Sequence, residues 1–179
     1  MRIISGKYRG LKLSDFDGND VRPTADRVKE SLFNVLYGKV AGASVLDLFC
    51  GSGNLGIECL SRGADSVHFN DISPASLEIL KKNIARLKNP QAFKITNYDY
   101  SVCLSRADKY DLIFIDPPYR LEIGVDALKL IGAGNLLKEG GLVVFERDRS
   151  FEGEVAGLIK TDERKYGKTY LTFFKRGEV

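Results

Sequence analysis

Metal-binding and disulfide-forming residues are scarce in this chain, which has one histidine and three cysteines among 179 residues. Cys50, Cys59 and Cys103 include no C-x-x-C pair, and any disulfide leaves one cysteine over. The sequence therefore predicts neither a metal site nor a disulfide framework, and it favours a reducing, cytoplasmic environment. His68, the single histidine, lies inside a predicted strand, where we expect a buried, hydrogen-bonded side chain and not a catalyst.

Long apolar segments are also missing. No run approaches the ~20 residues that span a bilayer, so we expect no membrane association. Arg2, Lys7, Arg9 and Lys12 interrupt the N-terminus where a secretory signal would have its apolar stretch. The composition is that of an average globular protein, with 44% hydrophobic and 28% charged residues.

Charge is nearly balanced, with a formal net charge of +3, but it is unevenly placed. The first twelve residues carry four positive side chains and no negative one. A near-neutral body with a basic end suits binding to a polyanion such as nucleic acid, although ordinary surface charge explains the same pattern.

The order of predicted strands and helices indicates the fold class. Residues 1–13 favour a β-hairpin or extended arm, and Thr24 is placed to cap a helix that ends near Tyr37. From residue 44 onward strands alternate with helices, which is typical of a parallel sheet with helices on both faces. The predicted strands are 44–49, 66–71, 92–97, 110–116 and 141–146, the helices are 54–62, 74–88 and 121–131, and a two-stranded tail over 158–174 turns at Tyr166-Gly167.

These elements predict an α/β, Rossmann-like fold. We expect a seven-stranded, mostly parallel sheet in which the C-terminal hairpin makes one strand antiparallel. Because there are no repeats and no linker, we expect one domain over residues 1–179, acting as a monomer. Its N-terminal arm and helix occupy 1–40, and its cofactor-binding, catalytic core occupies 41–179.

A glycine-rich turn follows the first strand of the core. Gly51, Gly53 and Gly56 fit G-x-G-x-x-G between a strand and a helix, where the backbone can approach a ligand closely. The spacing alone suits a dinucleotide, several other cofactors, or a tight turn that binds no ligand.

Nearby carboxylates favour S-adenosylmethionine (SAM) over a dinucleotide. Asp47 stands just before the loop, where it would repel a pyrophosphate but attract a cationic amino-acid end. Asp71 ends the second strand about 20 residues after the glycines, where a carboxylate accepts hydrogen bonds from ribose hydroxyls. Asp99 either reaches the adenine amino group or is a solvated turn residue. We expect the SAM site at Asp47, Phe49, Gly51, Gly53, Asp71, Ile72 and Asp99.

A rigid acidic corner ends the fourth predicted strand. Its two prolines fix the backbone and remove amide donors, so a carboxylate and carbonyls face the pocket as acceptors. The exocyclic amine of a base is a poor nucleophile, and acceptors at Asp116 and the Pro117 carbonyl would hold its hydrogens and stabilise the positive charge that develops on methylation. A flipped base would stack on the corner's tyrosine. The predicted catalytic residues are Asp116, Pro117, Pro118 and Tyr119.

These motifs resemble a known family. VLDLFCGSGNLGIE and DPPY look like motifs I and IV of class I SAM-dependent amino-methyltransferases, which many enzymes share. SGKYRGLKL, RPTADRVKESLFNVL, SRGADSV and KYGKTYLTFF resemble the RsmD family in particular, over nearly the full chain from Ile4 to Phe174. Cys50 and Asn54 stand where that family often has alanine, and Asn70 stands in a usually apolar stretch.

The resemblance implies methylation of the N2 amine of a guanine in 16S ribosomal RNA, within a 30S subunit or its assembly intermediate, with S-adenosylhomocysteine as the second product. Arg22 and Arg27 either contact this RNA or pair with Asp26 and Glu30 on the same helix, and the resemblance favours a role near the active site. The remaining substrate-binding residues that we expect are Arg2, Lys7, Arg9, Lys12 and Tyr119.

Three other functions are compatible with parts of the pattern. A DNA adenine-N6 methyltransferase uses the same corner, but such enzymes usually carry a target-recognition domain, for which 179 residues leave no room. A protein glutamine N5-methyltransferase normally has asparagine in place of Asp116. A non-catalytic RNA-binding protein would have no need for the acidic and glycine positions.

Overall fold

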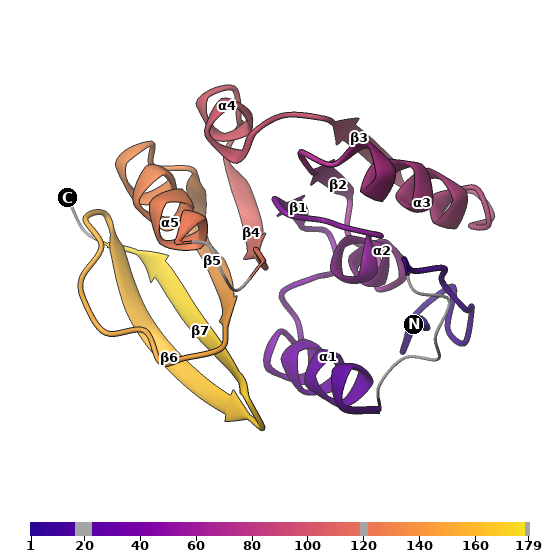
Figure 1. Ribbon diagram of the computed structural model, residues 1–179, viewed down its shortest axis with the longest axis horizontal. Helices are drawn as coiled ribbons and strands as arrows, with labels where there is room; N and C mark the ends of the chain where they lie inside the picture. The colour runs from indigo at the N-terminus through magenta and orange to yellow at the C-terminus, as the bar shows by residue number, and fades with distance from the viewer. Residues whose placement is uncertain (17–22, 119–121, 178–179) are drawn as a thin grey trace.

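The computed structural model describes residues 1–16, 23–118 and 122–177. Arg22 and Tyr119 of the predicted site lie outside the described residues. Within that part of the chain, seven strands form one sheet in the order β3-β2-β1-β4-β5-β7-β6 (Figure 1). The strands are β1 (Ser44–Asp47), β2 (Ser66–Asn70), β3 (Ala92–Thr96), β4 (Tyr110–Ile115), β5 (Leu137–Arg147), β6 (Leu158–Tyr166) and β7 (Thr169–Arg176).

Strand direction follows the predicted pattern. The first five strands pair in parallel, whereas β7 is antiparallel to both β5 and β6. The turn between β6 and β7 includes Gly167, which has a φ of +61°. The prediction of a mostly parallel, Rossmann-like sheet with one antiparallel strand is confirmed.

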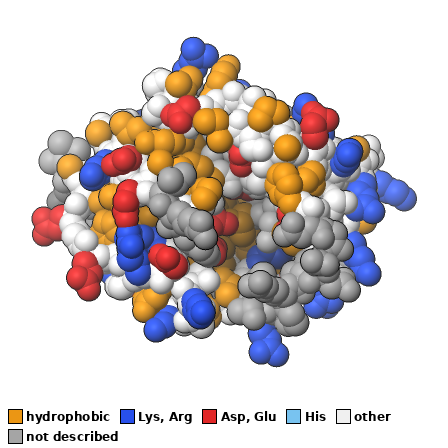
Figure 2. Space-filling model, in the orientation of Figure 1, with side chains coloured by type: hydrophobic (Ala, Val, Ile, Leu, Met, Phe, Trp, Pro, Cys, Tyr) orange, Lys and Arg blue, Asp and Glu red, His pale blue; other side chains and the backbone are white. Residues whose placement is uncertain are grey.

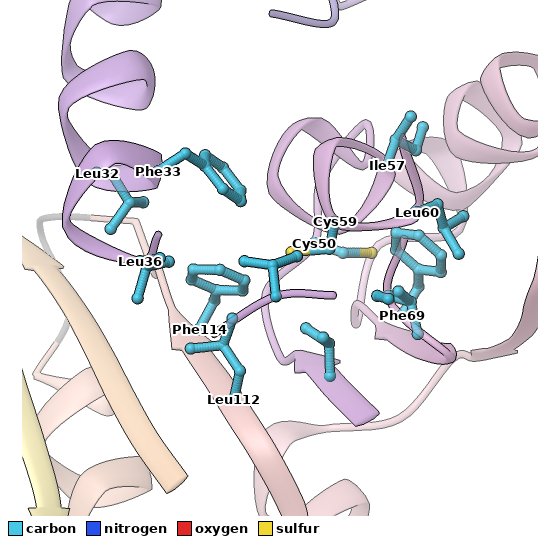
Figure 3. Close-up of a cluster of buried hydrophobic side chains, with 14 of the residues drawn as sticks. Leu32, Phe33, Leu36, Cys50, Ile57, Cys59, Leu60, Phe69, Leu112 and Phe114 are labelled. Atoms are coloured by element: carbon cyan, nitrogen blue, oxygen red, sulfur yellow. The ribbon is translucent and has the colours of Figure 1, made fainter. Parts of the chain in front are cut away.

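Helices cover both faces of the sheet. The helices are α1 (Pro23–Val35), α2 (Asn54–Ser61), α3 (Pro74–Ile84), α4 (Tyr100–Ser105) and α5 (Ile123–Ala133). Apolar side chains of α1, α2 and α3 share one buried cluster with alternate strand residues, and those of α4 and α5 share a second cluster with the intervening ones. Figure 3 shows Leu32 and Phe33 of α1, and Leu36 directly after this helix, beside Phe114 of β4, whose ring centroid lies 6.2 Å from that of Phe33.

A buried ion pair fastens the N-terminal segment to this core. The Glu58 side chain on α2 is 0% exposed and lies 3.1 Å from Lys29 Nζ on α1. The same carboxylate accepts hydrogen bonds from the backbone N–H groups of Ile4 and Ser5, and Lys29 donates to the Arg2 carbonyl. Because unpaired buried charges are costly, this network fixes the arm, α1 and α2 relative to one another.

The arm itself is a short hairpin, as expected. Arg2 and Lys12 form an antiparallel bridge, and the turn between them packs against α2, where the Lys7 N–H donates to the Ser61 carbonyl at 2.7 Å. Gly6 has a φ of +86°, and an added Cβ would lie 1.8 Å from the Ser61 carbonyl oxygen. Only glycine fits this contact.

Several boundaries differ from the predicted ones. Helix α4 was not predicted, because its six residues are too few to display an apolar period. Strand β5 begins four residues earlier than expected, at Leu137, because a bulge brings Leu137 opposite Tyr110 while Leu142 pairs with Leu112. Helix α1 ends at Val35, short of Tyr37, and α5 begins at Ile123.

Two further features of the described residues concern membranes and metal ions. No described helix is long and apolar enough to cross a membrane. The described residues also contain no cluster of three or more histidine, cysteine or carboxylate side chains that would hold a metal ion.

Candidate active site

Three neighbouring strands bring carboxylates together at their carboxyl ends. Asp47 is the last residue of β1, Asp116 directly follows β4, and Glu146 lies near the end of β5. Asp47 pairs with Phe114, which packs with Val144 beneath α1–α3. Because residues two apart on a strand share a face, Asp116 and Glu146 project to the same side of the sheet as Asp47.

The pKa values of two of these carboxyl groups, Asp116 and Asp47, are raised. Burial, followed by the negative charges of Glu146 and Asp47, raises the pKa of Asp116 well above its ordinary value. Burial also raises the pKa of Asp47 from 3.8 to about 7, with a smaller contribution from Asp71, although a hydrogen bond from the Gly56 N–H opposes the shift. The cluster therefore favours the binding of a positively charged group.

Two clefts meet at Asp116 and Glu146. The loop cleft, of about 740 Å³, follows the glycine turn, and the hairpin cleft, of about 600 Å³, lies between α1 and the tip of the β6–β7 hairpin. Figure 2 shows a hollow near the centre of the molecule with acidic side chains at its base. The residues that line both clefts are Phe49, Cys50, Asn54, Asp116 and Glu146.

The glycine turn forms one wall of the loop cleft. Gly51 has a φ of +54°, and a Cβ added there would meet open space, so its backbone is exposed to the cleft. Asp71 holds the turn because its Oδ2 accepts from the Gly51 N–H at 2.8 Å, while its Oδ1 accepts from the Ser73 N–H at 2.8 Å. A carboxylate oxygen can accept more than one hydrogen bond, so these contacts leave capacity for a ligand.

The other two glycines shape the turn without lining the cleft. An added Cβ at Gly53 would lie 2.3 Å from Leu80, and one at Gly56 would lie 2.2 Å from the Phe69 ring. The second and third glycines of the motif therefore allow α2 to pack closely against α3 and β2.

The remaining predicted cofactor residues separate into two groups. Ile72 is 67% exposed and Asp99 caps α4 by accepting from the Ser101 N–H at 2.9 Å, and both line the loop cleft. Asp47 is 2% exposed and lines the hairpin cleft instead. The predicted residues that the structure brings together along the loop cleft are Phe49, Gly51, Asp71, Ile72 and Asp99, with Asp116, Pro117 and Pro118 at its inner end.

Asn70 is buried and links these walls, although the sequence marked it only as a polar residue in a usually apolar stretch. Asn70 Nδ2 donates to the carbonyls of Leu48 and Tyr98, and its Oδ1 accepts from Thr96 Oγ1 at 2.8 Å. It therefore joins the ends of β1 and β3 to the loop before Asp99. The feature of the sequence that could have predicted this role is the position of polar Asn70 at the end of a mostly buried strand. His68 is buried between the Tyr110 hydroxyl and Thr96 Oγ1, each at 2.8 Å, as expected.

The hairpin cleft was not foreseen from the sequence. Its walls are Val28, Lys29 and Leu32 of α1 on one side and residues 166–169 on the other. Lys29 Nζ forms an ion pair with Glu58 and donates a hydrogen bond to Asn54 Oδ1 at 2.8 Å. Asn54 therefore has a structural role in this wall. The rest of the lining is mixed, with apolar side chains such as Val28 and Leu32 beside Lys168, Thr169 and three carboxylates.

The predicted basic residues that the structure describes do not form one continuous patch. Arg2, Arg9 and Arg27 share a surface depression with Asp26 and Glu30. Arg2 Nε lies 3.4 Å from Asp26, so Arg2 is partly neutralised by this neighbour.

The two lysines of the arm, Lys7 and Lys12, lie apart from that depression. Lys7 Nζ donates to the Asn89 carbonyl at 2.9 Å, and the backbone carbonyl of Lys12, whose side chain is exposed, accepts from Arg86.

Comparison with known proteins gives consistent similarities. A family model described as "Conserved hypothetical protein 95" matches residues 1–175. The putative rRNA methyltransferase YlbH of Bacillus subtilis is 37% identical over 182 residues, covering 98% of this chain and 99% of its own length. Ribosomal RNA small subunit methyltransferase D of Haemophilus influenzae is 35% identical over 153 residues, covering 83% and 79%. Among solved structures, the putative methyltransferase yhhF of Escherichia coli has a TM-score of 0.87 at 32% identity, covering 98% of this chain and 97% of that one.

The raised pKa of Asp47 leads to a stability prediction. A carboxyl group whose pKa is higher in the folded state destabilises the fold as the pH rises from the unfolded value, 3.8, through the folded value, about 7. We expect Asp47→Asn, which keeps an acceptor for the Gly56 N–H, to raise the free energy of unfolding at about pH 8 by at most roughly 4 kcal/mol. Urea unfolding should show a much smaller gain at about pH 4. An equal gain at both pH values would contradict the titration.

Proposed function

The chain belongs to the RsmD family of ribosomal RNA methyltransferases, and on that premise we propose that it transfers a methyl group from SAM to the exocyclic N2 amine of a guanine in 16S ribosomal RNA. The observation that carries the proposal is the meeting of two clefts at Asp116. One cleft suits the cofactor and the other suits a base, so the methyl group and its acceptor would meet at the acidic corner.

The loop cleft fits SAM by size and chemistry. Its volume of about 740 Å³ lies within the ordinary range for small-molecule sites. Asp71 would accept hydrogen bonds from the ribose hydroxyls, Ile72 would cover the adenine, and Asp99 would accept from its amino group. The backbone at Gly51 leaves room for close approach. The carboxylates at the inner end would favour a cofactor that carries ammonium and sulfonium charges.

In the proposed reaction the protein acts by positioning and by electrostatics. When bound, SAM supplies a methyl group on a positively charged sulfur that leaves as a neutral thioether. Asp116 and the Pro117 carbonyl accept hydrogen bonds from the N2 hydrogens and orient the nitrogen lone pair toward the methyl carbon. As the new bond forms, positive charge develops on this nitrogen beside Asp116. The excess proton is then acidic and is lost to a carboxylate or to water.

The hairpin cleft supports a flipped nucleotide as substrate. Chemistry on a base requires the base to leave its stack and enter a pocket. The apolar walls at Val28 and Leu32 would contact the base, and the carboxylates at the junction would accept hydrogen bonds from its polar edge. Tyr119 would supply a stacking surface.

The proposal is tested by product analysis. Unmethylated 16S ribosomal RNA and 30S particles, offered separately with isotopically labelled SAM, should yield labelled N2-methylguanosine after digestion to nucleosides. We expect one of the two substrates to react much faster, which identifies the form that the enzyme recognises. Labelled N6-methyladenosine, or label in a glutamine side chain of ribosomal protein, would replace the proposed function with one of its alternatives.

Asp116 should control the chemical step more than either binding step. Asp116→Asn retains one acceptor but loses the negative charge, and its amide can direct a donor at the substrate amine. We expect the single-turnover methylation rate at saturating RNA and SAM to fall by about 10²–10³. Asp111→Asn is a suitable control, because Asp111 lies at the opposite end of β4 from Asp116. Its carboxylate accepts hydrogen bonds from the Ser44 N–H and from Lys138 Nζ. A near-normal rate for Asp116→Asn would limit the corner to shaping the pocket.

Arg9 and Arg27 should contribute RNA affinity without affecting the cofactor. Both are exposed and lie in one depression. Because each phosphate contact releases counterions, replacing both with glutamine should reduce the slope of log K against log salt by about 1.5. SAM affinity should not change. The matched control replaces Lys109 and Lys129, at the amino end of β4 and on α5, and should leave the slope unaltered. An unchanged slope for the arginine pair would assign these residues a structural role.

A further inference from the structure

The placement of Glu146 bears on which base the enzyme accepts. Resting on the proposed function, we infer that Glu146 is the residue that selects guanine, because its carboxylate accepts the guanine N1–H while Asp116 holds the neighbouring N2 amine. Glu146 lines both clefts, so it lies at the same junction as Asp116.

The sheet fixes the relation between the two side chains. Ile115 of β4 pairs with Phe145 of β5 in parallel register, and Asp116 and Glu146 are the residues that directly follow this pair on the two strands. Neighbouring strands lie about 4.8 Å apart, and both side chains project to one face. Two carboxylates are therefore presented side by side to whatever enters the hairpin cleft.

This pair matches one edge of guanine. Guanine presents two adjacent donors there, N1–H and the N2 amine, and two adjacent acceptors satisfy both. Adenine presents its N6 amine beside N1, which is an acceptor, so a carboxylate at Glu146 would face a lone pair. Opposed acceptors in a buried site lose a hydrogen bond and add repulsion, and sites built for a specific hydrogen bond discriminate strongly for that reason.

Glu146 can serve this role while keeping contacts within the protein. Glu146 has interactions of its own in the folded chain, and its residue pairs with Leu171 of β7. A carboxylate has about four acceptor positions on its two oxygens, so a contact to the protein and one to a base are compatible. The side chain is only partly buried, which leaves it accessible from the clefts.

The test uses a base that keeps the amine but reverses N1. The position that the wild-type protein methylates is first located by nucleoside mapping, and RNA is then ligated with either guanine or 2,6-diaminopurine at that position. Diaminopurine retains the 2-amine, but its N1 is an acceptor. We expect the wild-type enzyme to prefer guanine by at least about 100-fold in kcat/KM. In Glu146→Gln the amide N–H can donate to N1 of diaminopurine, so the preference should fall below about 10-fold.

Controls separate base recognition from loss of structure. Glu146→Asp keeps the carboxylate and should retain the guanine preference at a lower rate. Glu122→Gln, a similar substitution at an exposed carboxylate that pairs with Arg147 and Arg149, should retain both rate and preference. If Glu146→Gln turns over too slowly, competition binding of the two RNAs measures the preference at the binding step, which should fall in the same direction.

The outcomes are distinguishable. If the wild-type protein forms N2-methylguanosine and Glu146→Gln keeps the full guanine preference, Glu146 does not read N1 and the inference fails alone. The same conclusion follows if the wild-type enzyme accepts diaminopurine as well as guanine. If the wild-type protein forms no N2-methylguanosine, the proposed function fails and the inference fails with it.

Discussion

Like-charge crowding at the ends of three parallel strands is the constraint on which the site depends. The order β1-β4-β5 makes Asp47, Asp116 and Glu146 neighbours, and their register points all three to one face. Holding these carboxylates in a partly dehydrated space costs folding free energy, which the apolar clusters on both faces of the sheet offset. Under the proposed function this cost has a use, because mutually repelling carboxylates favour the binding of a cationic cofactor and stabilise an amine that becomes cationic.

A second buried interaction supports the hairpin cleft on one side of that acidic junction. The Lys29–Glu58 pair holds α1 against α2 and gathers the backbone of the N-terminal arm around it. Helix α1 then supplies one wall of the hairpin cleft, and the antiparallel β7 brings the β6–β7 tip to the other side. The N-terminal segment is thus part of the framework that shapes the candidate site.

The sequence predicted the features that depend on local pattern and left out those that depend on register. Strand, glycine turn and helix follow from periodicity and from glycine chemistry, so the glycine turn and the acidic corner could be located along the chain, and the structure lines one cleft with residues of both. The proximity of Glu146 to Asp116 depends on the pairing of β4 with β5, which no local pattern contains. For the same reason the β6–β7 tip was recognised as a turn but not as a cleft wall. The pairing of Arg2 with Asp26 likewise joins segments that are distant in sequence.

The pH dependence of kcat/KM for SAM tests the electrostatic account most directly, because it reports the ionisation of the free enzyme. The ionised form of the cluster is the one that attracts the cofactor, and the pKa values of Asp47 and Asp116 are raised. The account therefore predicts that kcat/KM for SAM falls as the pH is lowered from about 8 to about 5.5, well above the range in which ordinary carboxyl groups titrate. A profile that stays flat over this range would show that the carboxylates carry their charge without mutual influence, and it would contradict the account.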